Sequence, residues 1–199
     1  MAMSDPSITI SSGFEEHERG QIARMYWAAF GQKLGRVMGP DRRAIAFIKD
    51  VLDPTHSLCA RDTSGTLLGA AGFKTYESAL VGGGWRDLAR HYGWFGSTWR
   101  VAFLALLERE TENHRFLMDG IFVSDGARGK GVGTALLTAI CDEAATRGYN
   151  EVRLDVIDSN PRARALYARE GFVAGGVQRL GPLKHIFGFE SATTMIRRL

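Results

Sequence analysis

A glycine-rich turn between a predicted strand and a predicted helix constrains the fold of this chain more than any other feature. Residues 116–123 form an apolar run of strand length, residues 126–133 are rich in glycine, and 134–147 follow with helical spacing. A second predicted strand comes next, at 151–157. A strand, a helix and a strand in this order predict a parallel strand pair joined by a right-handed crossover.

The segments on either side of this unit predict an otherwise antiparallel sheet. Alternation at 7–12 favours a short strand, and 57–76 favours a β-hairpin that turns at Asp62-Thr-Ser-Gly65. Helical spacing covers 15–30 and 42–52, and Asn160-Pro161 is typical of a helix start. Two last strands are expected near 172–180 and 187–197. The predicted fold class is α+β, or mixed α/β, with a central mixed, mostly antiparallel sheet and helices on both faces.

The composition predicts one globular domain over residues 1–199, with 45% hydrophobic and 24% charged residues. The net charge of +3 comes from 25 basic residues interspersed among 22 acidic ones, without the basic patch that favours nucleic-acid binding. We find no signal-peptide pattern and no apolar stretch of membrane-spanning length. Two distant cysteines, Cys59 and Cys141, suit a reducing compartment, and the histidines show no metal-ligand spacing. We expect a cytoplasmic protein that binds no nucleic acid, membrane or metal.

Residues 79–113 interrupt the pattern with a segment rich in aromatic side chains. It opens with Gly82-Gly-Gly-Trp85 and ends on an acidic run, Glu108, Glu110 and Glu112. We interpret it as a packed helical insertion with a solvated charged end. A lid or wall over a substrate pocket is compatible with the same residues.

Three designs for binding phosphate compete at the glycine-rich turn, where unpaired backbone N–H groups and the helix dipole converge. A nucleotide P-loop is excluded, because Val132-Gly133 stands where Lys-Ser/Thr is required. The second design is a dinucleotide-binding fold, which needs three glycines and an acid on the next strand. Gly131-Val-Gly133-Thr-Ala-Leu136 has two of these glycines, and Asp155 lies on the next strand. The third design is a coenzyme A pyrophosphate loop of the form Arg/Gln-x-x-Gly-x-Gly/Ala, which Arg128-Gly-Lys-Gly131-Val-Gly133 matches fully.

With its flanking strand and helix, this loop resembles the central motif of the GNAT superfamily of N-acetyltransferases. A second match follows in the correct order, and it resembles the strand and helix that flank the pantetheine arm in that superfamily. It consists of Leu154-Asp-Val156, Ser159-Asn160, Ala165-Leu-Tyr167 and Glu170-Gly-Phe172. The two matches cover about residues 116–174. The resemblance implies a parallel strand pair that splays apart, and acetyl-CoA as the co-substrate.

The resemblance also implies which residues hold acetyl-CoA. Seven consecutive residues would wrap the pyrophosphate with their backbone: Arg128, Gly129, Lys130, Gly131, Val132, Gly133 and Thr134. Three strand residues would pair their backbone groups with the acetyl carbonyl and the pantetheine amides: Ile121, Phe122 and Val123. Gly120 would allow a bulge in that strand. Asn160 would cap its helix and also contact the pantetheine.

Acetyl transfer to an amine needs a base for the ammonium proton and an acid for the leaving thiolate. Tyr167 stands where the superfamily places its general acid, with a core aromatic as the structural alternative. Asp155 stands where related enzymes often carry an acid that acts as a base through water. A solvated acid on the polar face is its structural alternative, and Asp119 on the preceding strand is the rival base.

We therefore expect an N-acetyltransferase that moves the acetyl group from acetyl-CoA to a primary amine by direct transfer in a ternary complex. The acceptor is a small-molecule or peptide amine. Tyr26, Trp27 and Phe30 on the first helix either line its pocket or belong to the core. Two alternatives stay open, an acyl-CoA-binding sensor without turnover and an NAD(P)-binding oxidoreductase. Similar proteins are often dimers, so a homodimer is one expected assembly.

Overall fold

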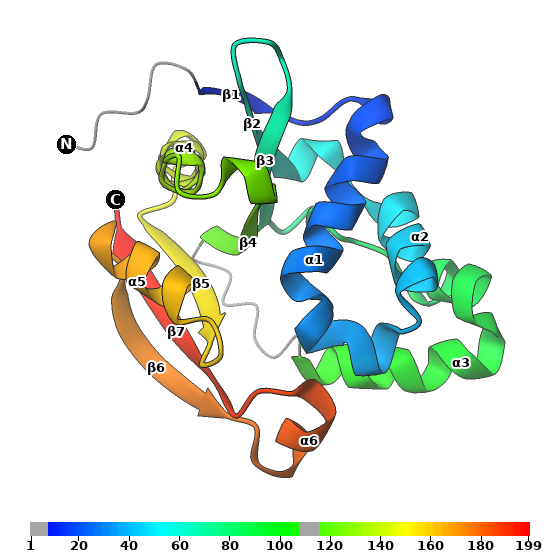
Figure 1. The fold of residues 1–199 in the computed structure, drawn as a ribbon. Coiled ribbons are helices and arrows are strands. Elements are labelled where there is room, and N and C mark those ends of the chain that lie inside the picture. Colours follow the sequence, from blue (N-terminus) through cyan, green and yellow to red (C-terminus); the bar gives the residue numbers. More distant parts are fainter. Residues whose placement is uncertain (1–7, 108–115) are drawn as a thin grey trace.

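A seven-stranded sheet forms the centre of the computed structural model, which describes residues 8–107 and 116–199 (Figure 1). Its strands are β1 (Thr9–Ser12), β2 (Ser57–Arg61), β3 (Leu67–Lys74), β4 (Phe116–Val123), β5 (Glu151–Ile157), β6 (Val173–Arg179) and β7 (Ser191–Arg198). They lie in the order β1-β2-β3-β4-β5-β7-β6, and every neighbouring pair is antiparallel except β4 and β5. The predicted mixed sheet with one parallel pair is therefore confirmed.

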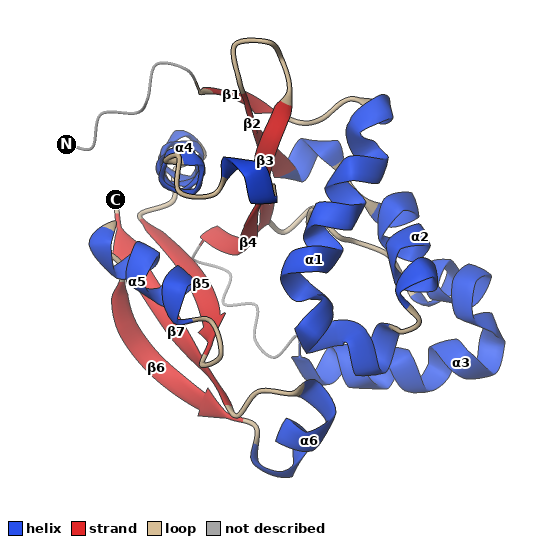
Figure 2. Ribbon diagram, in the orientation of Figure 1, coloured by secondary structure: helices blue, strands red, loops and turns tan. Residues whose placement is uncertain are grey.

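Helices surround the sheet, as Figure 2 shows. They are α1 (Arg19–Met38), α2 (Asp41–Val51), α3 (Trp85–Leu107), α4 (Val132–Thr146), α5 (Pro161–Arg169) and the short α6 (Lys184–Phe187). None of the helices in the described ranges is long and apolar enough to cross a membrane. The predicted insertion is helical over α3, while its acidic run, Glu108, Glu110 and Glu112, lies outside the described residues.

Two expected boundaries were wrong. The first long helix does not end near Phe30 but continues to Met38, through two glycines that weaken its apolar pattern. The last strand does not begin at Phe187, because residues 184–187 form α6 and the strand starts only at Ser191. Phe187 and Phe189 instead pack against Val37 near the end of α1, so tertiary packing overrides their preference for a strand.

Two apolar clusters hold the sheet between its helical layers. One cluster joins β2–β5 to α4 and α5, and it contains the predicted stripe of α4: Val132, Leu136, Leu137, Ile140 and Ala144. The other joins the opposite face to α1, α2 and α3 through Ile22, Phe47 and Leu88. Each of these side chains is almost completely buried. Each face of the sheet is therefore packed against its helices by a separate apolar cluster.

A bulge in β4 changes the face to which its side chains point. Gly72 of β3 is opposite Gly120, but Phe73 is opposite Met118, so Asp119 is the extra residue that the bulge inserts into β4. Before the bulge, Met118 packs in the cluster on the α4 side, and after it Phe122 packs on the α1 side. One extra residue therefore inverts the alternation. The bulge expected near Gly120 is confirmed.

Gly120 is the point at which α1 touches β4. A Cβ atom added there would lie only 2.2 Å from Cζ of Phe30. The ring of Phe30 also lies 4.6 Å, centroid to centroid, from that of Tyr26, which in turn contacts Phe122 at 5.8 Å. The absence of a side chain at Gly120 therefore lets an aromatic pair pack directly on the bulged strand.

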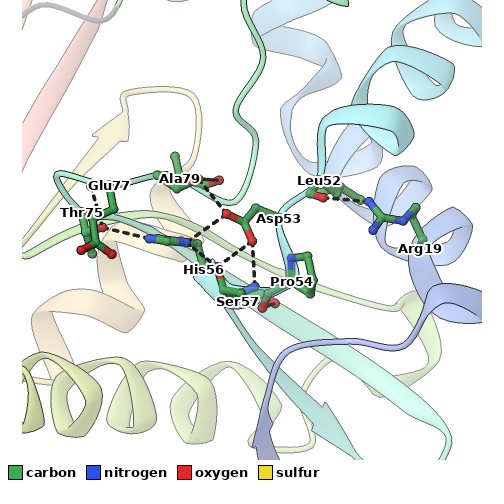
Figure 3. A network of polar contacts seen from close by, with 11 residues as sticks. Arg19, Leu52, Asp53, Pro54, His56, Ser57, Thr75, Glu77 and Ala79 are labelled. Atoms are coloured by element: carbon green, nitrogen blue, oxygen red, sulfur yellow. Dashed lines mark hydrogen bonds and ion pairs between the residues drawn. The ribbon is translucent and has the colours of Figure 1, made fainter.

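A polar network ties the segment after β3 to the start of β2 (Figure 3). Buried His56 places Nε2 2.8 Å from Oγ1 of Thr75 and Nδ1 3.2 Å from Oδ2 of Asp53. The same Asp53 oxygen accepts a hydrogen bond of 2.7 Å from the Ser78 hydroxyl, and the Asp53 N–H donates to the Leu80 carbonyl. The network thus fixes the chain that leads from β3 to residues 79–84.

The close approach at Gly120 predicts the effect of one added methyl group. Gly120→Ala should lower the free energy of unfolding by about 1–3 kcal/mol, because the Phe30 ring must move away from the strand. Urea denaturation measures this loss. Gly126→Ala is the control, since no atom lies within 4 Å of its added Cβ. Equal midpoints for the two variants would contradict the packing argument.

The Asp53 network predicts a stability change that depends on pH. Burial raises the pKa of Asp53, but hydrogen bonds from Thr55 and Ser78 and the nearby His56 outweigh it, so its pKa is lowered overall. Asp53→Asn should therefore cost about 1–3 kcal/mol of unfolding free energy at pH 7. Because a lowered pKa stabilises only above the ordinary value of 3.8, this cost should shrink as the pH falls below it.

Chemical denaturation of both proteins between pH 7 and pH 3 measures that difference. Asp142→Asn, at an exposed position on α4, is the matched control and should change the unfolding free energy by less than about 0.5 kcal/mol at either pH. A cost for the Asp53 variant that stays constant over this pH range would rule out the charged network.

Candidate functional site

The loop between β4 and α4 exposes backbone N–H groups at the start of the helix. Gly129 and Gly131 have positive φ angles of 77° and 80°, which other residues adopt only with strain. The first hydrogen bond of the helix runs from the Ala135 N–H to the Gly131 carbonyl. The N–H groups of the first turn therefore have no partner within the helix. No atom lies within 4 Å of an added Cβ at Gly129 or Gly131, so the space above the loop is open. These features fit an anion such as a pyrophosphate.

The side chains of the loop surround this opening without filling it. Arg128 and Lys130 are exposed, and Arg128 forms an ion pair of 2.9 Å with Asp125. Such an exposed pair contributes little to stability. An added Cβ at Gly133 would lie 3.3 Å from Leu166, so α5 packs close to the first turn of α4. The predicted cradle and the predicted second motif are therefore neighbours in space.

The parallel strands β4 and β5 pair over only two residues. Phe116 is opposite Val152 and Leu117 is opposite Arg153, and no further pair follows along either strand. Beyond this point the edges of β4 and β5 that face each other lack the hydrogen bonds of a sheet. Ile121 and Val123 direct their side chains to the α4 side, so their backbone is what borders the gap. The splayed pair that the sequence resemblance implied is present.

A cavity of about 670 Å³ opens where the two strands diverge. It is lined by four of the predicted site residues, Ile121, Asp155, Asn160 and Tyr167, and also by the rival base Asp119. The predicted loop residues 128–134 do not line it, and neither do Phe122 and Val123. The predicted site is thus divided between a cavity and an adjacent helix N-terminus.

Asp155 and Tyr167 reach the cavity from opposite faces of the sheet. Leu154 and Val156 point into the cluster on the α4 side, so Asp155 between them points the other way. Its Oδ1 accepts a hydrogen bond of 2.5 Å from the Thr194 hydroxyl, and its Oδ2 lies 3.5 Å from Arg153. These contacts fix the orientation of the carboxylate.

Tyr167 lies within the apolar cluster on the α4 side, with only 7% of its surface exposed. Burial raises the pKa of Tyr167 to about 12, so its hydroxyl is protonated at neutral pH. Asn160 accepts a hydrogen bond of 3.1 Å from the Ala163 N–H, which confirms its role as the cap of α5. This cap sets the start of the helix that carries Tyr167.

Aromatic residues of α1 form the wall opposite the strands. Tyr26, Trp27 and Phe30 all line the cavity, although all three also pack in the cluster on the α1 side. Burial and the nearby carboxylate of Asp119 raise the pKa of Tyr26 well above its ordinary value. The two readings of these residues, pocket and core, are therefore both correct.

Lining residues from the end of α1 and from α2 were not predicted, and they include Met38, Phe47 and Ile48. Others, among them Val81, Trp85, Leu88 and Val101, belong to the segment 79–113, for which a wall of a pocket was one of the two interpretations. The glycine run at 82–84 was the sequence signal for a wall at this place. Within the described ranges, no three His, Cys, Asp or Glu side chains gather as they would to hold a metal ion.

Comparisons with known proteins agree with this geometry. Residues 19–172 match the family model described as Acetyltransferase (GNAT) family. Over 82 residues the chain is 33% identical to a streptothricin acetyltransferase of Streptomyces lavendulae, a match that spans 41% of this chain and 43% of that relative. The chain thus matches less than half the length of this curated relative.

Two solved structures show the same fold. A GCN5-related N-acetyltransferase from Kribbella flavida superimposes with a TM-score of 0.61 at 17% identity, over 97% of this chain and 98% of that one. An N-acetyltransferase from Staphylococcus aureus gives 0.64 at 14% identity, over 94% and 99%. The family match decides against the dinucleotide-binding alternative. Because it spans well over half of the chain, the protein belongs to the GNAT family of acetyltransferases.

Proposed function

We propose that this chain is an N-acetyltransferase that transfers the acetyl group of acetyl-CoA directly to a primary amine in a ternary complex. The observation that carries the proposal is the divergence of β4 and β5, which opens one cavity to Asp155 and Tyr167 beside the glycine-rich start of α4. Acetyl-CoA supplies an acyl group already activated as a thioester. The chain's own residues have to bind it, orient the amine and move two protons.

Binding is assigned to backbone groups. The N–H groups of 131–134 precede the first hydrogen bond of α4 and suit the pyrophosphate, and the Thr134 hydroxyl is a further donor. The unpaired edge of β4 at 121–123 offers N–H and C=O groups to the amides of an extended arm, in the manner of an added strand. Asn160 lines the cavity from the opposite side.

Proton transfer is assigned to Tyr167 and Asp155, which both line the cavity and reach it from opposite faces of the sheet. Tyr167 is the acid, because burial keeps its hydroxyl protonated and no residue in the described part of the chain accepts its proton. Asp155 is the base, acting through water on the ammonium group, since Thr194 orients its carboxylate. Asp119 in the bulge is the alternative base.

Transfer in one step is supported by the state of the cysteines, which are the side chains best suited to carry an acyl group. Cys59 and Cys141 are both buried, and neither lines the cavity. Burial raises the pKa of Cys59 to about 11 and also raises that of Cys141. Thiols in this state are poor nucleophiles.

A thiol-release assay tests the proposal. With acetyl-CoA and a panel of primary amines that includes streptothricin, the protein should release free thiol at a rate that depends on the amine. Binding of coenzyme A without thiol release on any amine would support the sensor reading instead. If calorimetric titration with coenzyme A gave no heat, both the acetyltransferase proposal and the sensor alternative would be refuted.

The role of Tyr167 predicts a separation between turnover and binding. Tyr167→Phe should lower kcat by about a hundredfold, because the leaving thiolate then has no positioned donor. The dissociation constant for coenzyme A, measured by calorimetry, should change by less than about twofold. Tyr149→Phe is the matched control, since Tyr149 packs on the same cluster outside the cavity and should keep full turnover. An unchanged kcat for the Tyr167 variant would remove it from the mechanism.

The choice of base predicts different losses for two carboxylates in one cavity. Asp155→Asn should lower kcat by about a hundredfold and make the rate follow the fraction of amine that is already neutral in solution. Asp119→Asn should keep kcat within about fivefold and act mainly on the KM of the amine. Profiles of kcat/KM against pH for both variants measure this. If the Asp119 variant showed the larger loss of kcat, Asp119 and not Asp155 would be the base.

A further inference from the structure

We infer that the acceptor is an amine with an apolar body, whose ammonium end lies at the sheet and whose body extends under the helices. This inference rests on the proposed function, because it names the substrate of the same cavity. It concerns the shape and chemistry of the cavity walls rather than the reacting groups.

Charge is confined to one side of this cavity. Its charged lining side chains, among the residues that the structure describes, are Lys74, Asp119 and Asp155, and these belong to β3, β4 and β5. The lining residues from α1, α2, 79–84 and α3 contribute no charged side chain, and Gln32 is their only amide. A cationic group therefore finds its counter-ions at the sheet and none on the helical side.

The helical side is instead lined mainly by apolar side chains. Six of its lining residues come from three helices, α1, α2 and α3: Leu34, Met38, Phe47, Ile48, Leu88 and Val101. Four of them are almost fully buried, while Leu34 and Val101 are partly exposed. Removing apolar substrate surface from water against such a wall is favourable, whereas burying a second ammonium group there is costly.

Aromatic rings occupy the passage between the two sides. Phe30 packs on Gly120, and Tyr26 lies beside it, so both rings are next to the bulge that carries Asp119. The rings can accommodate a cation over their faces near the carboxylates and an apolar chain farther in. The arrangement fits a molecule that is cationic at one end only.

The total space is large enough for this arrangement. A cavity of about 670 Å³ lies within the range of about 300–1,000 Å³ that is usual for small-molecule sites. It therefore has room for an acyl arm and a small alkyl or arylalkyl amine. A long peptide would have to enter through the strand edge, away from the apolar wall.

Amines that differ in one group give the sharpest test. Pentylamine and 1,4-diaminobutane have the same number of heavy atoms, but the second replaces a terminal methyl group with an ammonium group. We expect kcat/KM to be at least tenfold higher for pentylamine. In the series from propylamine to hexylamine, it should rise about two- to fourfold with each methylene. A preference for 1,4-diaminobutane or streptothricin, or no gain with chain length, would overturn the inference and leave the proposed function intact.

A variant of the wall tests the location. Val101→Asn should lower kcat/KM for hexylamine by roughly tenfold and for propylamine by less than about twofold. Val177→Asn, on exposed strand β6 outside the cavity, is the matched control and should change neither value. Val81→Asn, on the same apolar side of the cavity, serves if circular dichroism shows that the first variant does not fold. Equal losses for both amines in a folded variant would place the body elsewhere.

Calorimetry separates this inference from the proposed function. The same amines are titrated into protein saturated with coenzyme A. Tighter binding of pentylamine than of 1,4-diaminobutane, in a protein that releases no thiol from acetyl-CoA with any amine of the panel, would support the apolar site and refute the acetyltransferase proposal. Equal or weaker binding of pentylamine would refute the apolar site, whether or not any amine is acetylated.

Discussion

Hydrogen bonding between β4 and β5 stops after two residue pairs, and the geometry of the whole candidate site depends on that divergence. If the strands stayed paired, the backbone of 121–123 would be used within the sheet and no cavity could reach both of its faces. The bulge at Asp119 and the ring of Phe30 on Gly120 accompany the divergence. After the bulge, Phe122 packs on the α1 side, while Leu154 and Val156 of β5 pack on the α4 side.

The features that could be predicted from sequence depend on local chemistry. Strands β4 and β5 have the predicted bounds, since apolar residues bordered by polar or glycine-rich turns suffice to locate them. Gly131 lies in the loop that the sequence predicted and has a positive φ there, and Asn160 caps α5 as its position before proline indicated. A resemblance in two motifs then identified the family, because both motifs lie on this local framework.

The features that could not be predicted arise from packing between distant segments. Phe187 resembles a strand residue locally, yet it joins α6 because Val37 and Phe189 offer an apolar contact there. The wall of the cavity brings Phe47 of α2 against Leu88 of α3, and no periodicity in either helix indicates that pairing. His56 shows the same limit, since it has no metal-ligand spacing and its partners Asp53 and Thr75 only meet in the fold.

The separation of charged strands from apolar helices also separates the two tasks of the proposed enzyme. Asp155 and Tyr167 lie on β5 and α5, within the second of the two motifs that the sequence resemblance covers. The walls come from α1, α2, 79–84 and α3, outside those motifs, and the Asp53 network fixes one of them to the start of β2. Changes in α3 can therefore alter which acceptor fits without displacing the two residues to which we assign proton transfer. For this reason the residues on the sheet and α5 indicate the class of reaction, while the residues of the helical wall indicate the acceptor.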